Sequence, residues 1–442
     1  MENLTAATRE ELIAIIETLL ARVAELEEEI RRLRQGKGGG AGVVVKPSRP
    51  PREPRERKQR DRAFVRRREP ADEEVRHAVE QCPKCGRGLH GGWEHDRRQV
   101  IEVVVQRRVI DHVIVGRWCG VCQERCLPKL SESELGVQGK RRFGASVQSL
   151  VATLHIGCRM PVKLIPKLLG EMCGLHLGDG EVVKLLEGVR SAGAGELARL
   201  KERVRSAPAV CADETGWREN GQNGYLWGFF TPTDRYFEYR KSRAAAVPEE
   251  ILGEDFGGVV TCDFYAGYNH TGVLQRCWAH LLRDAKELAE MNGDRPEVVG
   301  WVEALRGLYR EAKAACLALE SLPAEHRARG RERRRLEKEA TKLAQPYAND
   351  PEAPQRLLAQ RILKHLHELF VFVSDPRVPG DNNLAERSLR PAVIGRKISG
   401  GTRSSKGSAT RTGLMSLFAT WAAQGKRQLQ GCREILLPTP AP

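Results

Sequence analysis

Apolar residues near the N-terminus recur at alternating spacings of four and three, with charged residues between them. The members of this seam are Leu12, Ile16, Leu19, Val23, Leu26, Ile30 and Leu33. Branched residues at one heptad position and leucine at the other favour a parallel two-stranded coil. We therefore predict that residues 1–35 form a leucine-zipper-like coiled coil through which two copies of the chain self-associate. An amphipathic helix docked on its own domain is the alternative.

A second stretch, residues 140–200, also carries apolar residues at helical spacing, among them Val147, Leu150, Val151 and Leu154. Glycines at 174–180 supply a turn between two predicted helices. This pattern is compatible with a helix-turn-helix that reads DNA, and equally with an ordinary helical core.

Short apolar runs then alternate with turns, which is the pattern of an α/β domain. Residues 209–215, 225–231, 236–239 and 258–265 are predicted strands, and residues 244–252 are a predicted helix before the last of them. Three strands, a helix and a strand are the opening order of a ribonuclease H-like fold. In that fold the first and fourth strands are neighbours, so Asp213 and Asp263 are expected to lie side by side.

A third acid is available farther along the chain. Glu386 lies in a predicted helix that Asp381 or Asn382 can cap and Pro391 bounds. Three carboxylates repel one another unless cations neutralise them. Oxygen ligands suit two Mg²⁺ or Mn²⁺ ions about 4 Å apart, which promote phosphodiester cleavage.

Each acid also has a purely structural interpretation. Asp213 could simply end a strand, with Glu214 as a rival for its role. Asp263 could be a turn acid. Glu386 could pair with Arg390 one helical turn away. It is the combination in ribonuclease H order that favours a catalytic site.

The charge balance points to a polyanionic partner. The 442 residues include 73 Lys and Arg against 58 Asp and Glu, a formal net charge of +15. Such an excess favours nucleic acid, with an acidic membrane surface as the weaker candidate. Residues 36–75 are basic, rich in Gly and Pro and poor in apolar residues, which predicts a flexible arm along DNA phosphates. No apolar run approaches the roughly 18 residues of a spanning helix, so we expect a cytoplasmic, nucleoid-associated protein without membrane contact.

Paired cysteines predict a structural metal. Cys82 with Cys85, and Cys119 with Cys122, form two CxxC motifs. Four thiolates complete the tetrahedral shell of one Zn²⁺ and leave no open position for catalysis. The β-branched run at 100–115 predicts strands between the motifs. Four unrelated thiols are the alternative, and Cys126, His90 and His112 are potential substitute ligands.

A basic strip surrounds the third acid. Its members are Arg387, Arg390, Arg396, Lys397, Arg403 and Lys406. Such a strip can bind DNA phosphates beside the metals, or it can be a solvated face. Gly400 and Gly401 would let the backbone approach DNA closely. Trp278 and His280 could stack on a base or organise the site, or be buried for structural reasons.

Five motifs together resemble transposases of the insertion sequence sixty-six family, specifically their large, TnpC-type DDE subunit. They read DETGW (213–217), NGYLW (223–227), CDFYAGY (262–268), RCWAHLLRD (276–284) and DNNLAERSLRPAVIGRKISGGTRSSKG (381–407). The leucine-rich N-terminus and the double CxxC module are also similar to that family. The resemblance implies that Asp213, Asp263 and Glu386 are a DDE triad and that an α-helical insertion separates the last two. It also implies accessory transposition proteins as partners.

The sequence thus predicts a multidomain DNA transposase that binds the terminal inverted repeats of an insertion sequence and its target DNA, cleaves with two metal ions, and transfers strands. A non-catalytic zinc-containing DNA-binding regulator and a ribonuclease H-like nuclease without joining activity are the alternatives. The expected parts are a coiled coil (1–35), a basic linker (36–75), a zinc-ribbon-like module (76–130), a helical DNA-binding segment (140–200), an α/β ribonuclease H-like catalytic core (205–284 and 381–425), an α-helical insertion (285–380) and a C-terminal tail (426–442).

Overall fold

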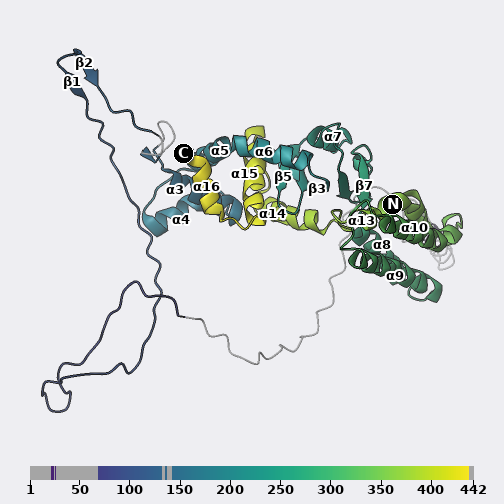
Figure 1. Ribbon diagram of the computed structural model, residues 1–442, viewed down its shortest axis with the longest axis horizontal. Coiled ribbons are helices and arrows are strands. Elements are labelled where there is room, and N and C mark those ends of the chain that lie inside the picture. Colours follow the sequence, from purple (N-terminus) through teal and green to yellow (C-terminus); the bar gives the residue numbers. More distant parts are fainter. Residues whose placement is uncertain (1–20, 24, 26–67, 132–134, 137–141, 438–442) are drawn as a thin grey trace, which may run out of the picture. The chain divides into compact units, whose positions relative to one another are not determined.

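The computed structural model describes residues 21–23, 25, 68–131, 135–136 and 142–437 (Figure 1). The chain divides into two compact units, residues 1–102 and 103–442. The predicted coiled coil and most of the basic linker lie outside the described residues, apart from a helical fragment at 21–23 and 25. In the described part of the first unit, the chain is irregular around a tight turn at Cys82.

A five-stranded mixed sheet forms the centre of the second unit, with strand order β5-β4-β3-β6-β7. The strands are β3 (Ala209–Glu219), β4 (Gln222–Phe230), β5 (Arg235–Arg240), β6 (Val259–Cys262) and β7 (Val273–Arg276). β3, β4 and β5 are joined as antiparallel hairpins, whereas β6 and β7 run parallel to β3. α7 (Ala246–Leu252) connects β5 to β6. This order is the predicted one and is compatible with a ribonuclease H-like domain.

Both faces of the sheet are covered, as the consecutive buried residues at 209–212 of β3 and 226–230 of β4 require. On one face, Cys211, Trp217 and Leu226 pack against α14 (Asn383–Ser399). On the other, Val210 and Trp227 pack against α6 (Ala194–Arg205) and α7.

The helical segment that precedes the sheet shares a core with the C-terminal helices. The helices concerned are α3 (Ala145–Ala152), the π-helical turn η2 (Thr153–Gly157), α4 (Leu164–Cys173), α5 (Asp179–Ala192), α15 (Ser405–Ala423) and α16 (Gln428–Leu436). α4 ends at Gly174, whose φ of 63° is the left-handed conformation that commonly ends a helix. The buried face of α5 is turned into this core, because Val182, Leu186 and Val189 pack there.

A second helical body lies between β7 and α14 in the sequence. It comprises α8 (Trp278–Met291), α9 (Pro296–Ala318), α10 (Arg327–Ala348), α11 (Arg356–Lys364), α12 (Leu366–Leu369) and α13 (Val371–Ser374), which share one apolar core. Trp278 is fully buried there, stacks on Tyr309 and donates its Nε1–H to the Leu369 carbonyl at 2.6 Å. Stacking of Trp278 on a DNA base is therefore excluded.

The predicted strands at 100–115 are absent from the structure. The chain is irregular there, and its β-branched side chains are exposed, Val103 and Val104 by 85% each. A short hairpin of β1 (Arg117–Cys119) and β2 (Glu124–Cys126) follows. The β-branched run has no partner strand to supply cross-strand hydrogen bonds, so its propensity alone does not produce a strand. Among the described residues, no helix is long and apolar enough to cross a membrane.

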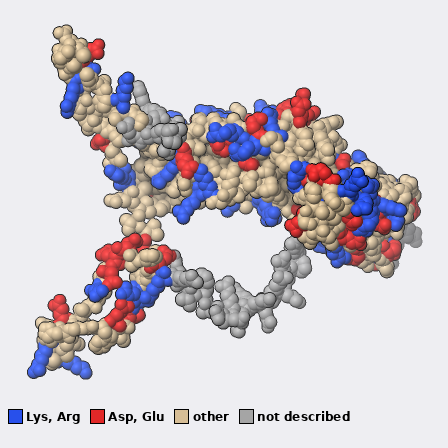
Figure 2. Space-filling model, viewed as in Figure 1, with Lys and Arg blue, Asp and Glu red and all other residues tan. Residues whose placement is uncertain are grey.

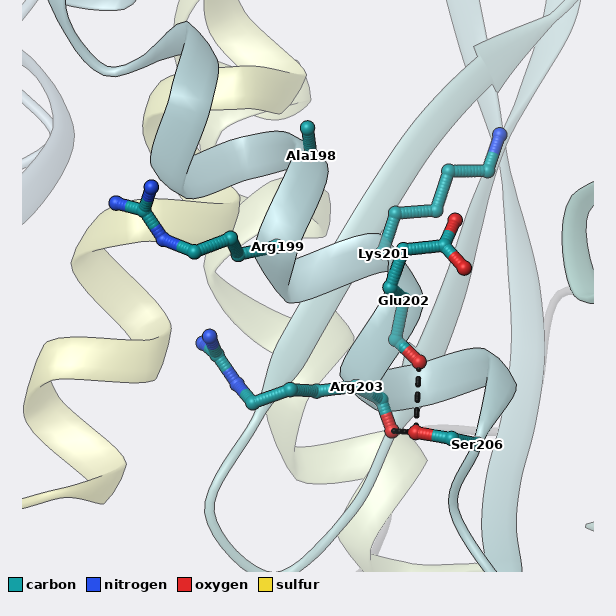
Figure 3. Close-up of a pocket in the computed structure, with 6 residues that line it drawn as sticks. All are labelled: Ala198, Arg199, Lys201, Glu202, Arg203 and Ser206. Atoms are coloured by element: carbon teal, nitrogen blue, oxygen red, sulfur yellow. Dashed lines mark hydrogen bonds between the residues drawn. The ribbon is translucent and has the colours of Figure 1, made fainter.

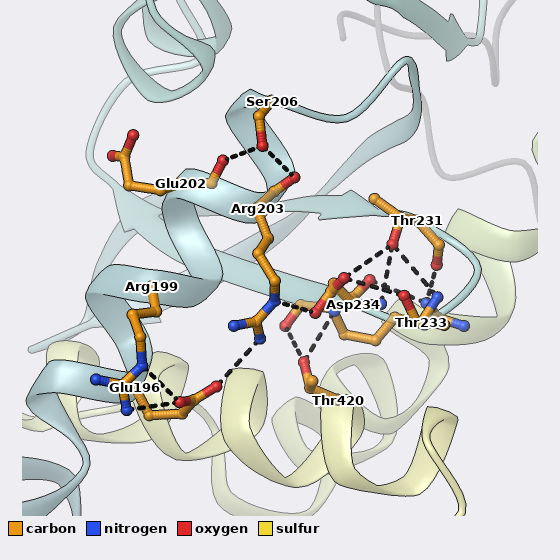
Figure 4. A network of polar contacts seen from close by, with 10 residues as sticks. Glu196, Arg199, Glu202, Arg203, Ser206, Thr231, Thr233, Asp234 and Thr420 are labelled. Atoms are coloured by element: carbon orange, nitrogen blue, oxygen red, sulfur yellow. Dashed lines mark hydrogen bonds and ion pairs between the residues drawn. The ribbon is translucent and has the colours of Figure 1, made fainter.

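Polar contacts attach α6 to the turn between β4 and β5 (Figure 4). The Arg203 guanidinium donates to Asp234 at 2.9 Å and to Glu196 at 3.1 Å, and the Arg235 backbone N–H donates to the Thr420 hydroxyl at 2.9 Å. An open hollow on α6 is lined by Ala198, Arg199, Lys201, Glu202, Arg203 and Ser206 (Figure 3). None of the three predicted catalytic acids lines this hollow.

Candidate active site

Asp213 lies within β3 on the face that meets α14. Cys211 and Trp217, at even spacings on either side, pack with Ala385 and Leu389 of α14. Because side chains alternate along a strand, Asp213 projects from the same face. β3 does not end at this acid, as the sequence suggested, but continues to Glu219.

Asp263 immediately follows β6, the parallel neighbour of β3. Thr261 lies opposite Cys211 in the register of the two strands. Two residues beyond this pair in each strand direction, the same register places Asp263 level with Asp213. One Asp263 carboxylate oxygen accepts the Tyr265 backbone N–H at 2.9 Å, which orients the side chain.

Glu386 is in the first turn of α14, and a buried asparagine holds that turn against β3. The Asn382 side-chain amide donates to the Ala212 carbonyl at 2.8 Å, and its backbone N–H donates to the Cys277 sulfur at 3.1 Å. Asn382 is fully buried, and its own side-chain oxygen has no hydrogen-bond partner among the described residues. Asn382 therefore attaches α14, the helix of Glu386, to β3 at Ala212, the residue before Asp213. Sequence reasoning treated it only as a potential helix cap.

Two residues of α8 flank the Glu386 carboxylate. Its Oε1 lies 3.7 Å from His280 Nε2 and 3.3 Å from Arg283 Nη2. His280 was expected either to organise the site or to be structural, and the structure places it beside the third acid. The sequence predicts no role for Arg283, which belongs to the RCWAHLLRD motif. Its position one turn from His280 on a helix was the available signal.

The pKa of Asp213 reflects its burial and the charges of neighbouring acids. Burial, reinforced by the negative charges of Glu214, Asp263 and Glu386, raises the pKa of Asp213 to about 7. Like charges near a partly buried carboxylate favour its protonated form, and a bound cation would reverse this. The donor set, carboxylate oxygens, fits Mg²⁺ or Mn²⁺. As they stand, the described residues include no group of three His, Cys, Asp or Glu side chains close enough to hold a metal ion. Metal binding by these acids is therefore a proposal.

Glu214, the rival acid, is occupied by other partners. Its side chain is 3% exposed, accepts the Tyr268 hydroxyl at 2.5 Å and pairs with Arg243 at 2.5 Å. Burial raises the pKa of Glu214 despite these two hydrogen bonds. Among the residues that the structure describes, Asp213 by contrast accepts one hydrogen bond, from the Glu214 backbone N–H, so it is the freer of the two acids.

The residues of the predicted DNA-binding strip differ in their exposure to solvent. Exposed side chains belong to Arg387, Arg390, Lys397, Arg403 and Lys406. Lys406 pairs with Glu187 at 2.7 Å, with its own side chain 74% exposed. Arg396 instead turns inward and donates to the Gly216 carbonyl of β3. The strip thus combines solvent-facing cations with one that joins α14 to the sheet.

The expectation that Gly400 and Gly401 approach DNA needs correction for Gly401. Its φ is 123°, and a Cβ at this position would lie 2.1 Å from the Arg218 carbonyl oxygen. The next residue, Thr402, accepts the Asn220 N–H and donates its own N–H to Arg218 O, at 2.8 and 2.9 Å. The close approach at Gly401 is therefore to the β3–β4 hairpin within the protein.

Each CxxC motif forms a tight turn suited to a metal ligand pair. Backbone N–H groups of Lys84 and Cys85 lower the pKa of the Cys82 thiol. Those of Cys122 and Val121 lower the pKa of Cys119 in the same way.

The two CxxC pairs belong to different units, so a single four-cysteine site stays a prediction. All four thiols are free, and neither His90, His112 nor Cys126 belongs to a metal-holding group in the part of the chain that the structure describes.

Comparison with known proteins agrees with this geometry. The family model for the transposase IS66 family matches residues 140–410, more than half of the chain, including all three acids and the helices from α3 to α14. No match was found among curated proteins. Membership implies an enzyme that binds DNA, cleaves it and transfers it. With its ribonuclease H-like strand order and a family match that spans the site, this chain belongs to the transposase IS66 family.

Proposed function

We propose that the chain is the DDE transposase of an insertion sequence, with Asp213, Asp263 and Glu386 as its catalytic metal ligands. The observation that carries this proposal is the convergence of three elements distant in the sequence: β3, the end of β6 and the first turn of α14. β6 pairs with β3, and Asn382 fastens α14 to β3. The raised pKa of Asp213 supports it, because the charges of the other two acids reach that carboxyl group.

Each residue then has a defined task. Asp213, Asp263 and Glu386 would hold two Mg²⁺ or Mn²⁺ ions. The chemistry that such a pair supplies is activation of a water or a DNA 3′-hydroxyl and neutralisation of charge on the leaving oxygen. Glu214, Tyr268 and Arg243 would keep β3 and the segment after β6 in place, because their hydrogen bonds join these elements.

The exposed cations of the basic strip would bind phosphates of the element end and of target DNA. The four CxxC cysteines would hold one structural Zn²⁺, and the N-terminal coil would pair two copies. The enzyme would act on nucleoid DNA in the cytoplasm, with accessory transposition proteins as partners.

The products formed by the purified full-length chain separate the candidate functions. The substrate is duplex DNA carrying the terminal inverted repeat found beside the gene, with a second duplex as target. A transposase gives joined product in Mg²⁺ and none in EDTA. Linear product without joining would indicate a nuclease, and binding without cleavage a regulator. Either of these last two results would overturn the proposal.

A further inference from the structure

The helix α10 is held in the insertion in one rotational orientation. Leu336, Ala340 and Ala344 are fully buried on one of its faces. Arg329, on the same face, is 1% exposed and donates to the carbonyls of Leu322 at 3.1 Å, Val373 at 3.2 Å and Leu319 at 2.5 Å. This guanidinium satisfies carbonyls at the ends of α9 and α13, so it joins three helices.

The two flanks of α10 are also tied to neighbours. On one flank, Arg333 donates to Glu337 at 2.9 Å and to the His367 carbonyl at 2.7 Å. On the other flank, Arg335 pairs with Glu332 at 2.7 Å and with Glu311 of α9 at 3.4 Å. Arg333 and Arg335 therefore already have ion-pair and hydrogen-bond partners within the protein.

Over residues 327–338, the remaining face of α10 carries cations alone. Arg327, Arg331, Arg334 and Lys338 are all exposed and follow one another at spacings of four, three and four. At 100° per residue this spacing forms one stripe, opposite the face that contains Leu336 and Ala340. None of the four forms an ion pair with any residue that the structure describes. We call these four residues the α10 stripe. Figure 2 shows Lys and Arg side chains gathered over α10.

We propose that the α10 stripe binds the sugar-phosphate backbone of duplex DNA without reading its sequence. The stripe runs from Arg327 to Lys338, twelve residues, whose ends lie about 17 Å apart at the rise of an α-helix. One strand of duplex DNA presents a phosphate every 3.4 Å or so along the axis, so roughly five phosphates lie within that length. Four unpaired cations therefore match one strand of the backbone.

The composition of α10 favours DNA over an acidic protein. Stable protein interfaces usually include a buried apolar centre. No large hydrophobic side chain of α10 is exposed in the structure, every residue of this helix being described. The inference rests on the proposed function only in that both require DNA as the partner. The catalytic acids play no part in it.

The test is the salt dependence of DNA binding by the full-length chain. The variant combines Arg327→Gln, Arg331→Gln, Arg334→Gln and Lys338→Gln, and binding to a fluorescent 40-base-pair duplex is followed by anisotropy as KCl is raised. Each phosphate contact contributes about −0.9 to the slope of log affinity against log salt, so the variant should lose about 3 to 4 from this slope. Affinity should fall about tenfold or more at 100 mM salt, equally for element-end and unrelated duplexes.

A matched control removes the same number of charges from cations that are already paired with acids. It combines Arg199→Gln, Arg306→Gln, Lys342→Gln and Lys426→Gln, whose partners are Glu196, Glu303, Glu339 and Glu434. An unchanged slope in the stripe variant, or an equal loss in the control, would overturn the inference. An acidic-protein partner predicts the first of these results. Because binding is measured without cleavage, wild-type protein that fails to join DNA would defeat the proposed function alone.

Discussion

At the scale of single residues, the protonation of Asp213 has a measurable effect on stability. Its folded-state pKa of about 7 lies above the ordinary aspartate value of 3.8, so its contribution to stability is complete below pH 4 and is lost as the pH rises to 7. In EDTA, Asp213→Asn should therefore raise the free energy of unfolding at pH 7.5, by on the order of a few kcal/mol, and change it little at pH 4. Urea denaturation at both pH values measures this difference.

The same variant should also lose the stabilisation that Mg²⁺ gives the wild-type protein at pH 7.5. Asp255→Asn is the control, since Asp255 is an exposed acid in the loop before β6. Equal stability of Asp213→Asn and wild type in EDTA at pH 7.5 would show that neither burial nor the other acids raise the pKa of Asp213.

At the scale of elements, the loop after α14 depends on one glycine. A Cβ on Gly401 would collide with the Arg218 carbonyl, whereas a Cβ on Gly400 would meet nothing within 4 Å, although its φ is also positive at 71°. Both substitutions carry the conformational cost of a positive φ, but only Gly401→Ala adds a collision. We therefore expect Gly401→Ala to reduce the free energy of unfolding by roughly 1–3 kcal/mol more than Gly400→Ala does, and to have the lower thermal midpoint. Equal effects of the two substitutions would contradict the close contact between this loop and the β3–β4 hairpin.

The proposed zinc site leads to a separate prediction about metal content. If both CxxC pairs bind one ion, the purified chain contains about one Zn²⁺ per molecule, and Cys85→Ser loses most of it because three thiolates bind more weakly than four. Cys158→Ser is the control, an exposed cysteine outside both motifs. Elemental analysis after gel filtration measures the content. Full zinc retention in Cys85→Ser would mean that Cys85 is not a ligand.

The elements differ in how far the sequence could predict them. The alternation of short apolar runs with turns predicted the order of β3 to β6, because turns bound each strand and β3, β4 and β6 each contain a run of consecutive buried residues. The β-branched run at 100–115 has the same composition, yet it forms no strand, since strand formation depends on a partner that no local pattern specifies. The anchoring role of Asn382 was equally hidden, because its hydrogen bonds reach Ala212 and Cys277, far away in the sequence.

At the scale of the whole molecule, long-range packing brings together segments that seemed independent. Residues 426–442 were predicted to be a tail, but α16 lies there and contributes Cys432 and Leu436 to the core of α3 and α5. The pattern of α16 is too short to reveal its partner. The triad itself stays a prediction: the register of the parallel strands points to Asp213 and Asp263, and the family resemblance points to these two acids and to Glu386.

The central claim is that three carboxylates distant in the sequence act as one metal-dependent site. It is tested most directly by strand transfer in Mg²⁺ with Asp263→Ala, beside Asp255→Ala and wild type, at equal occupancy of the element-end DNA. We predict that Asp255→Ala joins DNA like the wild type, and that Asp263→Ala binds the same DNA but joins it roughly a hundredfold more slowly or not at all. Joining by Asp263→Ala at the wild-type rate would contradict the account.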